Sequence, residues 1–356
     1  MEDIIFFIFC LLSIININIK GIDDFLFDYM DLENTSQIKG IFVWMIIFSH
    51  NKKYYKYKIQ NKYIYIKILK YLGQKMVSLF LFYSGYGIIE SFKKKGNKYI
   101  STLPKKGNIL FIKFQLILII FLTNNIICGI KINLKQYLLS MIFKSCIGNS
   151  NWFAFTIICL YYFSFFSFIL IKNKNYIFIG IIINSIICFF FTILVYKFYY
   201  IKKKYAVDNI FCFVIGLYYS LLKKYLNDFF MNNDIIFLGS LLIIIIIFYL
   251  INKINLLFIS IQNCLFCIII ALITMKVRFK NEFLKFLNNQ SYSICLLQRV
   301  VMIFVYHNNL FINSFFIRFF FIFTTTLFLS SIFDKYTFFI NKFFLNSSTL
   351  FCNKFL

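Results

Sequence analysis

The chain has 356 residues, 61% of them hydrophobic, 22% aromatic and 14% charged, with a formal net charge of +25. A soluble domain of this length is close to half apolar, so the composition excludes a water-soluble globular enzyme. The lysines lie in short loops between apolar segments, which favours contact with anionic lipid headgroups over nucleic-acid binding.

The N-terminal segment is apolar over residues 4–19 and lacks the basic start and small-residue cleavage site of a signal peptide. We expect a short span or an anchoring helix there. An acidic stretch over residues 23–33 follows, and Asn34, Thr35 and Ser36 are residue types that cap helices. These residues predict the start of the next helix.

Ten further segments are predicted membrane spans, several of them shorter than 20 residues. They cover residues 38–50, 76–90, 109–128, 152–171, 176–196, 209–222, 235–251, 255–275, 290–306 and 310–333. Residues 54–74 mix Lys, Tyr and Ile, which suits a helix lying in the headgroup region. Lys and Arg divide almost evenly between the two sides, so the positive-inside rule gives no orientation.

The sequence therefore predicts an all-α, multi-pass protein of the cell membrane, with about ten core transmembrane helices plus a short N-terminal hydrophobic helix. We divide it into an N-terminal hydrophobic segment (1–20), a membrane domain (21–340) and a C-terminal tail (341–356). Cys264 and Cys267 form a CxxC within a predicted span, with no second ligand pair nearby, so we expect no metal site.

Lys39 and His50 stand eleven residues apart in the first core span. On a helix this spacing brings two side chains to within about 20° of one direction and about 16 Å apart along the axis. Imidazole can act as base or acid near neutral pH. We expect both residues to face a common cavity, whereas a histidine that only anchors a helix end is the alternative.

The next span contains Ser84, Gly85, Tyr86 and Gly87. Glycines without side chains let another helix or a slender ligand approach closely, and the Ser84 and Tyr86 hydroxyls would lie in that gap. Helix packing is an equal alternative to a ligand site.

Asn149, Ser150 and Asn151 precede Trp152, which opens an aromatic-rich span. The three are capping types, and free N–H groups at a helix start favour an anionic group. Trp152 is also a typical residue of the membrane interface.

Arg299 lies inside the predicted span 290–306, where a charge normally faces a cavity or a partner because lipid exposure is costly. Gln298 beside it is under the same constraint. Arg318 is a weaker case, since its long side chain can reach the membrane surface.

Taken in order, these segments resemble the acyltransferase-3 family of integral membrane acyltransferases, closest to the branch that modifies bacterial cell-envelope polymers. The family's basic residue, ten intervening residues and histidine correspond to Lys39 and His50, and its F-x-x-SGY element to residues 80–87. Residues 149–152 resemble its tryptophan-led span start, and residues 291–298 its Ser-Tyr-Ser-Ile-x-Leu-Leu-His element, with Gln298 replacing histidine.

Two features depart from the family pattern. Gly107 follows Lys105 and Lys106 where a basic residue is usual after the proline of that loop, and residues 152–162 lack the acidic residue that some members carry. These departures concern how coenzyme A is held.

The resemblance implies transfer of an acyl group, acetyl first of all, from acyl-coenzyme A as co-substrate to a hydroxyl of a cell-envelope polysaccharide. His50 would act as general base or transient acyl acceptor, and Arg299 and Gln298 would stabilise the oxyanion. Binding of the donor would involve the remaining candidates, which are Lys39, Ser84, Gly85, Tyr86 and Trp152. A carrier or flippase for a lipid-linked sugar and a non-catalytic scaffold are the two alternatives.

Overall fold

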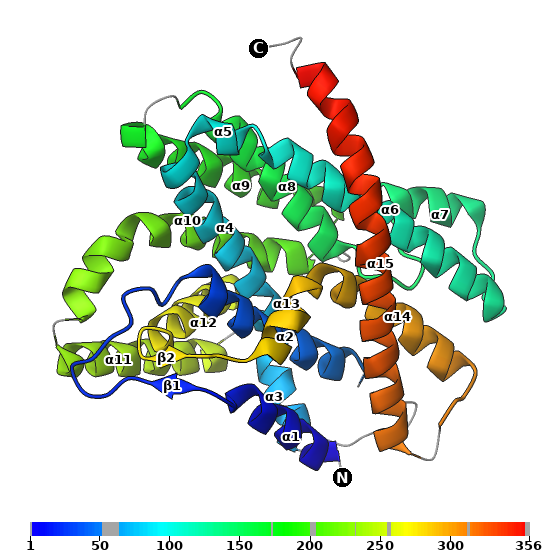
Figure 1. Ribbon diagram of the computed structural model, residues 1–356, viewed down its shortest axis with the longest axis horizontal. Helices are drawn as coiled ribbons and strands as arrows, with labels where there is room; N and C mark the ends of the chain where they lie inside the picture. Colours follow the sequence, from blue (N-terminus) through cyan, green and yellow to red (C-terminus); the bar gives the residue numbers. More distant parts are fainter. Residues whose placement is uncertain are drawn as a thin grey trace.

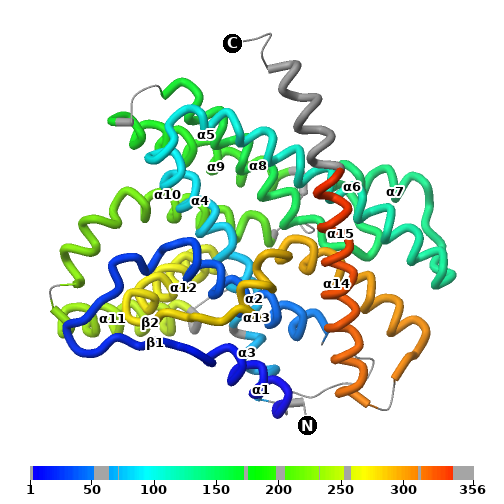
Figure 2. Tube along the Cα trace, viewed as in Figure 1, coloured from blue at the N-terminus to red at the C-terminus, as the bar shows by residue number. Residues whose placement is uncertain are grey.

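The computed structural model describes residues 2–51, 64–171, 174–199, 204–231, 233–254, 258–311 and 314–352. The described chain is almost entirely helical, as expected for an all-α protein (Figure 1). The exception is a short antiparallel pair in which β1 (Asn18–Ile19) pairs with β2 (Val277–Arg278). Figure 2 traces these two segments, blue and yellow, side by side.

The helices follow one another with short connections. They are α1 (Glu2–Ile14), α2 (Leu32–Asn51), α3 (Ile64–Leu72), α4 (Lys75–Lys95), α5 (Asn97–Ile100), α6 (Leu103–Ile127), α7 (Leu134–Met141), α8 (Trp152–Phe168), the 3-10 turn η2 (Lys174–Tyr176), α9 (Ile177–Tyr199), α10 (Lys204–Phe230), α11 (Asp234–Ile254), α12 (Ile259–Ile273), α13 (Glu282–Asn289), α14 (Ser291–His307) and α15 (Phe315–Cys352).

Within the described residues, five helical stretches are long and apolar enough to cross a membrane. They are Asn97–Ile127, Ile177–Lys197, Tyr205–Phe230, Asp234–Ile251 and Phe315–Phe339. Other predicted spans are helices too short for this criterion, such as Trp152–Phe168 and Ser291–His307. A membrane protein is therefore supported, but the expected count of ten spans is not confirmed.

The N-terminal helix α1 packs onto the bundle. At 13 residues it is about 20 Å long, shorter than the roughly 30 Å of a bilayer's hydrocarbon core. Phe6 and Phe9 are buried, each with its ring 5.5 Å from that of Trp44. Trp44 in turn donates a hydrogen bond to the Ser13 hydroxyl at 3.0 Å. Of the two expectations, the anchoring helix fits this arrangement.

The N-terminal hydrophobic segment thus contributes to the same core as the membrane domain. At the other end of the chain, α15 continues past residue 340, so the predicted tail 341–356 starts inside a helix. Residues 52–63 of the expected headgroup segment lie outside the described residues, while α3 covers part of its remainder.

Helices α4 and α10 form the closest helix pair in the fold. They run in the same direction, because Gln74 meets Asn209 at one end and Glu90 meets Ser220 at the other. A Cβ atom added to Gly85 would lie only 2.2 Å from the carbonyl oxygen of Phe213. Glycine therefore allows the two backbones to touch.

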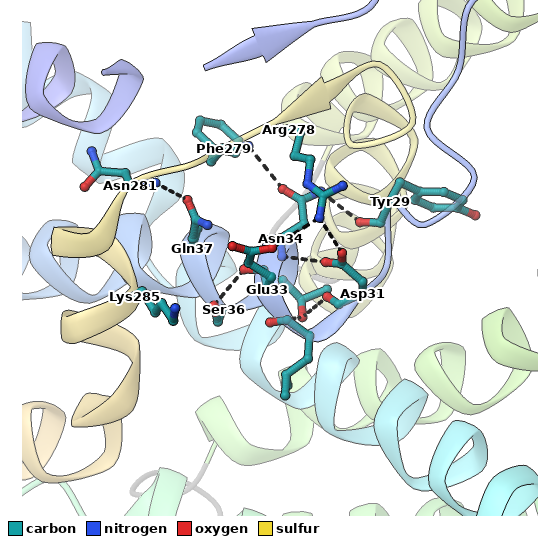
Figure 3. Close-up of polar contacts among 12 residues, drawn as sticks. Tyr29, Asp31, Glu33, Asn34, Ser36, Gln37, Arg278, Phe279, Asn281 and Lys285 are labelled. Carbon is teal, nitrogen blue, oxygen red and sulfur yellow. Dashed lines mark hydrogen bonds and ion pairs between the residues drawn. The ribbon is translucent and has the colours of Figure 1, made fainter. Parts of the chain in front are cut away.

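The start of α2 is held by a polar network (Figure 3). Arg278 on β2 pairs with Asp31 at 2.8 Å and with Glu33 at 3.2 Å. The Asp31 carboxylate also accepts the backbone N–H of Asn34 at 2.6 Å. Asp31 is therefore the cap, and the expected capping residues 34–36 lie inside the helix.

The same network continues into the chain that leads to α13. The backbone N–H of Asn281 donates to the Gln37 side chain at 2.6 Å, and that of Phe279 donates to Asn34 at 3.3 Å (Figure 3). A Cβ atom on Gly40 would lie 2.1 Å from the carbonyl oxygen of Leu284, so α2 and α13 are in backbone contact. These contacts fix the position of the helix that carries Lys39 and His50.

Candidate functional site

A cavity of about 530 Å³ brings together candidate residues from distant parts of the chain. His50 at the end of α2, Asn149 and Trp152 at the start of α8, and Arg299 on α14 all line it. We call it the His50 cavity. Its wall also includes Tyr205 near the start of α10, and residues of α3 and α4.

Arg299 carries an uncompensated charge in this cavity. It is half-buried, and among the described residues it forms no ion pair and its Nε has no hydrogen-bond partner. By contrast, Lys113 on α6 is paired with Asp334 at 2.6 Å. A buried guanidinium without a carboxylate favours binding of an anionic group.

The loop before α8 supplies a second unsatisfied donor. The Asn151 amide donates to the carbonyls of Phe143 at 3.0 Å and Ser145 at 2.7 Å. Asn149 accepts the backbone N–H of Ile147 at 2.9 Å, while its buried Nδ2 has no partner within the described residues. These amides hold the loop in place and make no cap, contrary to the expectation for residues 149–151.

Trp152 and Tyr205 form an aromatic wall of the His50 cavity. Their ring centroids lie 6.1 Å apart with planes inclined by 51°. Such surfaces pack against the apolar faces of ligands while the ring edges stay polar.

Lys39 lines a different cavity of about 320 Å³, together with Tyr83, Ser84, Phe153 and Tyr292. We call it the Lys39 cavity. The Lys39 ammonium lies 6.0 Å from the centroid of the Tyr83 ring. The expectation that Lys39 and His50 share one cavity is therefore wrong.

The two cavities follow one another along the same four helices. On α4 the lining changes from Val77 to Ser84, and on α14 from Arg299 to Tyr292. Seven residues correspond to about 10 Å of helix rise. On α8 the lining passes from Trp152 to Ile157.

Aromatic rings stand where one cavity gives way to the other. Phe153 follows Trp152 directly, and its ring centroid lies 6.3 Å from that of Phe80 and 6.5 Å from that of Tyr292. We call these three side chains the aromatic partition. Their presence explains why the Lys39–His50 stripe of α2 borders two spaces.

Three predicted site residues line neither cavity. Gly85 faces the α10 backbone, so packing is its role here. Tyr86 is 6% exposed and stacks edge-on with Tyr219, with centroids 6.3 Å apart. Gln298 is fully buried and donates to the Cys295 carbonyl at 3.0 Å. Adjacent helical residues point about 100° apart, so Gln298 and Arg299 cannot both face one cavity.

Arg318 is also accounted for outside the cavities. Its guanidinium donates two hydrogen bonds to the carbonyl of Phe311, at 3.2 and 2.9 Å, and lies 5.1 Å from the Tyr306 ring. Within the described residues, no group of three or more His, Cys, Asp or Glu side chains could hold a metal ion.

Several lining residues were not predicted. Tyr205 belongs to a Lys- and Tyr-rich connection that resembles the other loops of this chain in composition. Phe153 and Tyr292 lie within predicted motifs, but aromatic residues are too common in this sequence to stand out. The neighbours of Trp152 and Arg299 were the only signal that could have found them.

Comparisons with protein-family models, with curated proteins and with solved structures found no match to this chain. The acyltransferase-3 resemblance therefore stands on the quoted motifs alone, and its consequences are proposals.

Proposed function

We propose that this protein is a membrane O-acyltransferase that moves an acetyl group from acetyl-coenzyme A to a hydroxyl of a cell-envelope glycan. The observation that carries the proposal is the meeting of His50, Arg299 and Trp152 in one cavity. These residues come from three of the motifs on which the resemblance rests, and they are far apart in the sequence.

The chemistry needs a base, a nucleophile and a site for negative charge. In the proposed reaction His50 takes the proton of the acceptor hydroxyl as its oxygen attacks the thioester carbonyl. The tetrahedral oxyanion is stabilised by Arg299 and by the free amide donor of Asn149. The C–S bond then breaks, and the proton on His50 passes to the coenzyme A thiolate.

The Lys39 cavity would hold the rest of the donor. Tyr99 lines that cavity and accepts a hydrogen bond from Lys106 at 3.1 Å, so Lys39 and Lys106 approach it from different helices. Two ammonium groups suit the phosphates of coenzyme A. The pantetheine arm is thin and unbranched, and would pass the aromatic partition toward His50.

A carrier for a lipid-linked sugar is the second candidate. It is favoured by one observation, the succession of two cavities along the same helices with an aromatic wall at Trp152 and Tyr205. In a carrier these spaces would form a passage, and no acyl donor would be bound.

The first experiment distinguishes the two by binding. The purified full chain in detergent is heated with acetyl-coenzyme A, with coenzyme A or with neither, and the midpoint of thermal unfolding is compared. An acyltransferase is stabilised by a ligand that binds the folded state, whereas a sugar carrier is not. Mass spectrometry of cell-surface glycans with and without the gene then reports acetylation and identifies the acceptor.

A further inference from the structure

A third cavity, of about 420 Å³, lies at the opposite end of the α4–α10 pair from the His50 cavity. Gln74 lines the His50 cavity, whereas Glu90 lines the third one, sixteen residues further along α4. This separation corresponds to about 24 Å of helix rise, close to the thickness of a bilayer's hydrocarbon core. The third cavity therefore belongs to the other end of the bundle, away from the proposed chemistry.

Three lysines line this cavity, and one of them is fully engaged. The Lys93 ammonium contacts the Glu90 carboxylate at 2.8 Å, the Ser220 carbonyl at 2.6 Å and the Ser220 hydroxyl at 3.0 Å. An ammonium has three donors, so these contacts use its capacity and neutralise Glu90.

Lys223 and Lys224 hold the remaining positive charge. Neither forms an ion pair within the described part of the chain. The half-buried Lys223 ammonium lies 5.2 Å from the Tyr29 ring and 5.9 Å from the Tyr86 ring. Ring faces attract the cation but satisfy none of its hydrogen bonds.

The tyrosines beside Lys223 do not supply a counter-charge. The Tyr29 and Tyr219 hydroxyls are 2.9 Å apart and share a hydrogen bond. Burial raises the pKa of Tyr29 to about 12, so its hydroxyl is neutral at physiological pH. Asp228 is the one lining carboxylate besides Glu90, and it leaves the two free lysines with a net charge of one.

Two more observations indicate a polar ligand with an apolar neighbour. The buried Asn227 side-chain oxygen has no hydrogen-bond partner among the described residues, although Asn227 lines the cavity. Outside it, α10 exposes Leu222, Tyr225 and Phe229 to 48%, 71% and 56%. In a membrane protein such a stripe faces acyl chains.

We propose that the Lys223 cavity binds the phosphate of an anionic phospholipid headgroup, with the acyl chains along the exposed stripe of α10. Basic pockets between membrane helices recognise such headgroups because lysine is a point-charge partner for phosphate. This site is independent of the acyltransferase proposal, since it shares no lining residue with the His50 cavity or the Lys39 cavity.

The test measures thermal unfolding of the purified full chain in detergent with three probes. They are dioctanoyl phosphatidylglycerol, dioctanoyl phosphatidylcholine and inorganic phosphate. The variant is Lys223→Gln combined with Lys224→Gln, and the control is Lys285→Gln, an exposed lysine on α13. We expect phosphatidylglycerol alone to raise the midpoint, and the double variant to need at least about tenfold more lipid for the same shift.

Each other outcome is decisive. An equal shift with phosphatidylcholine, or a shift that the double variant keeps, would overturn the site. A shift with inorganic phosphate that the double variant loses would keep the phosphate site but overturn the lipid as its source. The double variant should still respond to acetyl-coenzyme A if the acyltransferase proposal holds, so failure of either proposal can be told from failure of the other.

Discussion

The His50 cavity and the Lys39 cavity share their helices but differ in what lines them. The first presents an unpaired guanidinium, Arg299, and a free amide donor, Asn149. The second is walled by aromatic rings, and its one cation, Lys39, lies against Tyr83. Stabilising a developing negative charge needs preorganised donors. The comparison therefore assigns the reaction to the His50 cavity and only grip on the donor to the Lys39 cavity.

The largest effect should come from His50. We expect His50→Ala to lower glycan acetylation by about 10²–10⁴-fold, the usual contribution of a general base. Because the histidine is half-buried at the end of α2, the thermal unfolding midpoint should change little. Acetyl transfer is measured by mass spectrometry of the acceptor glycan.

The matched control is His307→Ala, which removes the other histidine from an exposed helix end. It should leave acetylation unchanged. If His50→Ala kept full activity, the His50 cavity would lose its role as the site of reaction.

A second, smaller loss is expected for Arg299→Gln. Removing one oxyanion donor costs about 10²–10³-fold in rate. The stability of the protein should hold or improve, because Arg299 makes no ion pair within the described residues. Arg278→Gln gives the opposite pattern, since it breaks pairs with Asp31 and Glu33 and should lower the unfolding midpoint first. Loss of stability without loss of rate in Arg299→Gln would make it a structural residue.

The convergence of His50, Trp152 and Arg299 was predictable because polar groups in apolar helices must face an interior space. Which cavity each residue faces was not predictable. That depends on helix rotation, as Gln298 and Arg299 demonstrate, and on aromatic rings such as Phe153 that a Phe-rich sequence does not single out.

Long apolar helices such as α9 and α11 follow directly from the sequence, because only apolar length is needed. The buried start of α2 does not. Gln37 is 1% exposed and satisfied by the backbone of Asn281, more than two hundred residues away. Such pairing depends on tertiary structure, and the polar residues alone predicted a helix cap at that point.

Two glycines of one motif test the reading of the Ser84–Gly87 element as a gap. We expect Gly85→Ala to destabilise the protein by about 1–3 kcal/mol, because the added Cβ would overlap the Phe213 carbonyl. Gly87→Ala should leave the unfolding midpoint within about 0.5 kcal/mol of the original stability, since nothing lies within 4 Å of its Cβ. Chemical denaturation of both variants measures the difference. Equal costs would contradict the packing role of Gly85.

The smallest effect should come from Lys39→Gln. If Lys39 only grips the donor, the KM for acetyl-coenzyme A should rise by about tenfold, the value of one charge-assisted contact, while kcat stays within about twofold. Lys285→Gln, outside both cavities, should change neither constant. A fall in kcat at constant KM would instead put Lys39 in contact with the transition state. The aromatic partition would then not separate two roles, because a group reached only across Phe80 and Phe153 could not act on the carbonyl at His50.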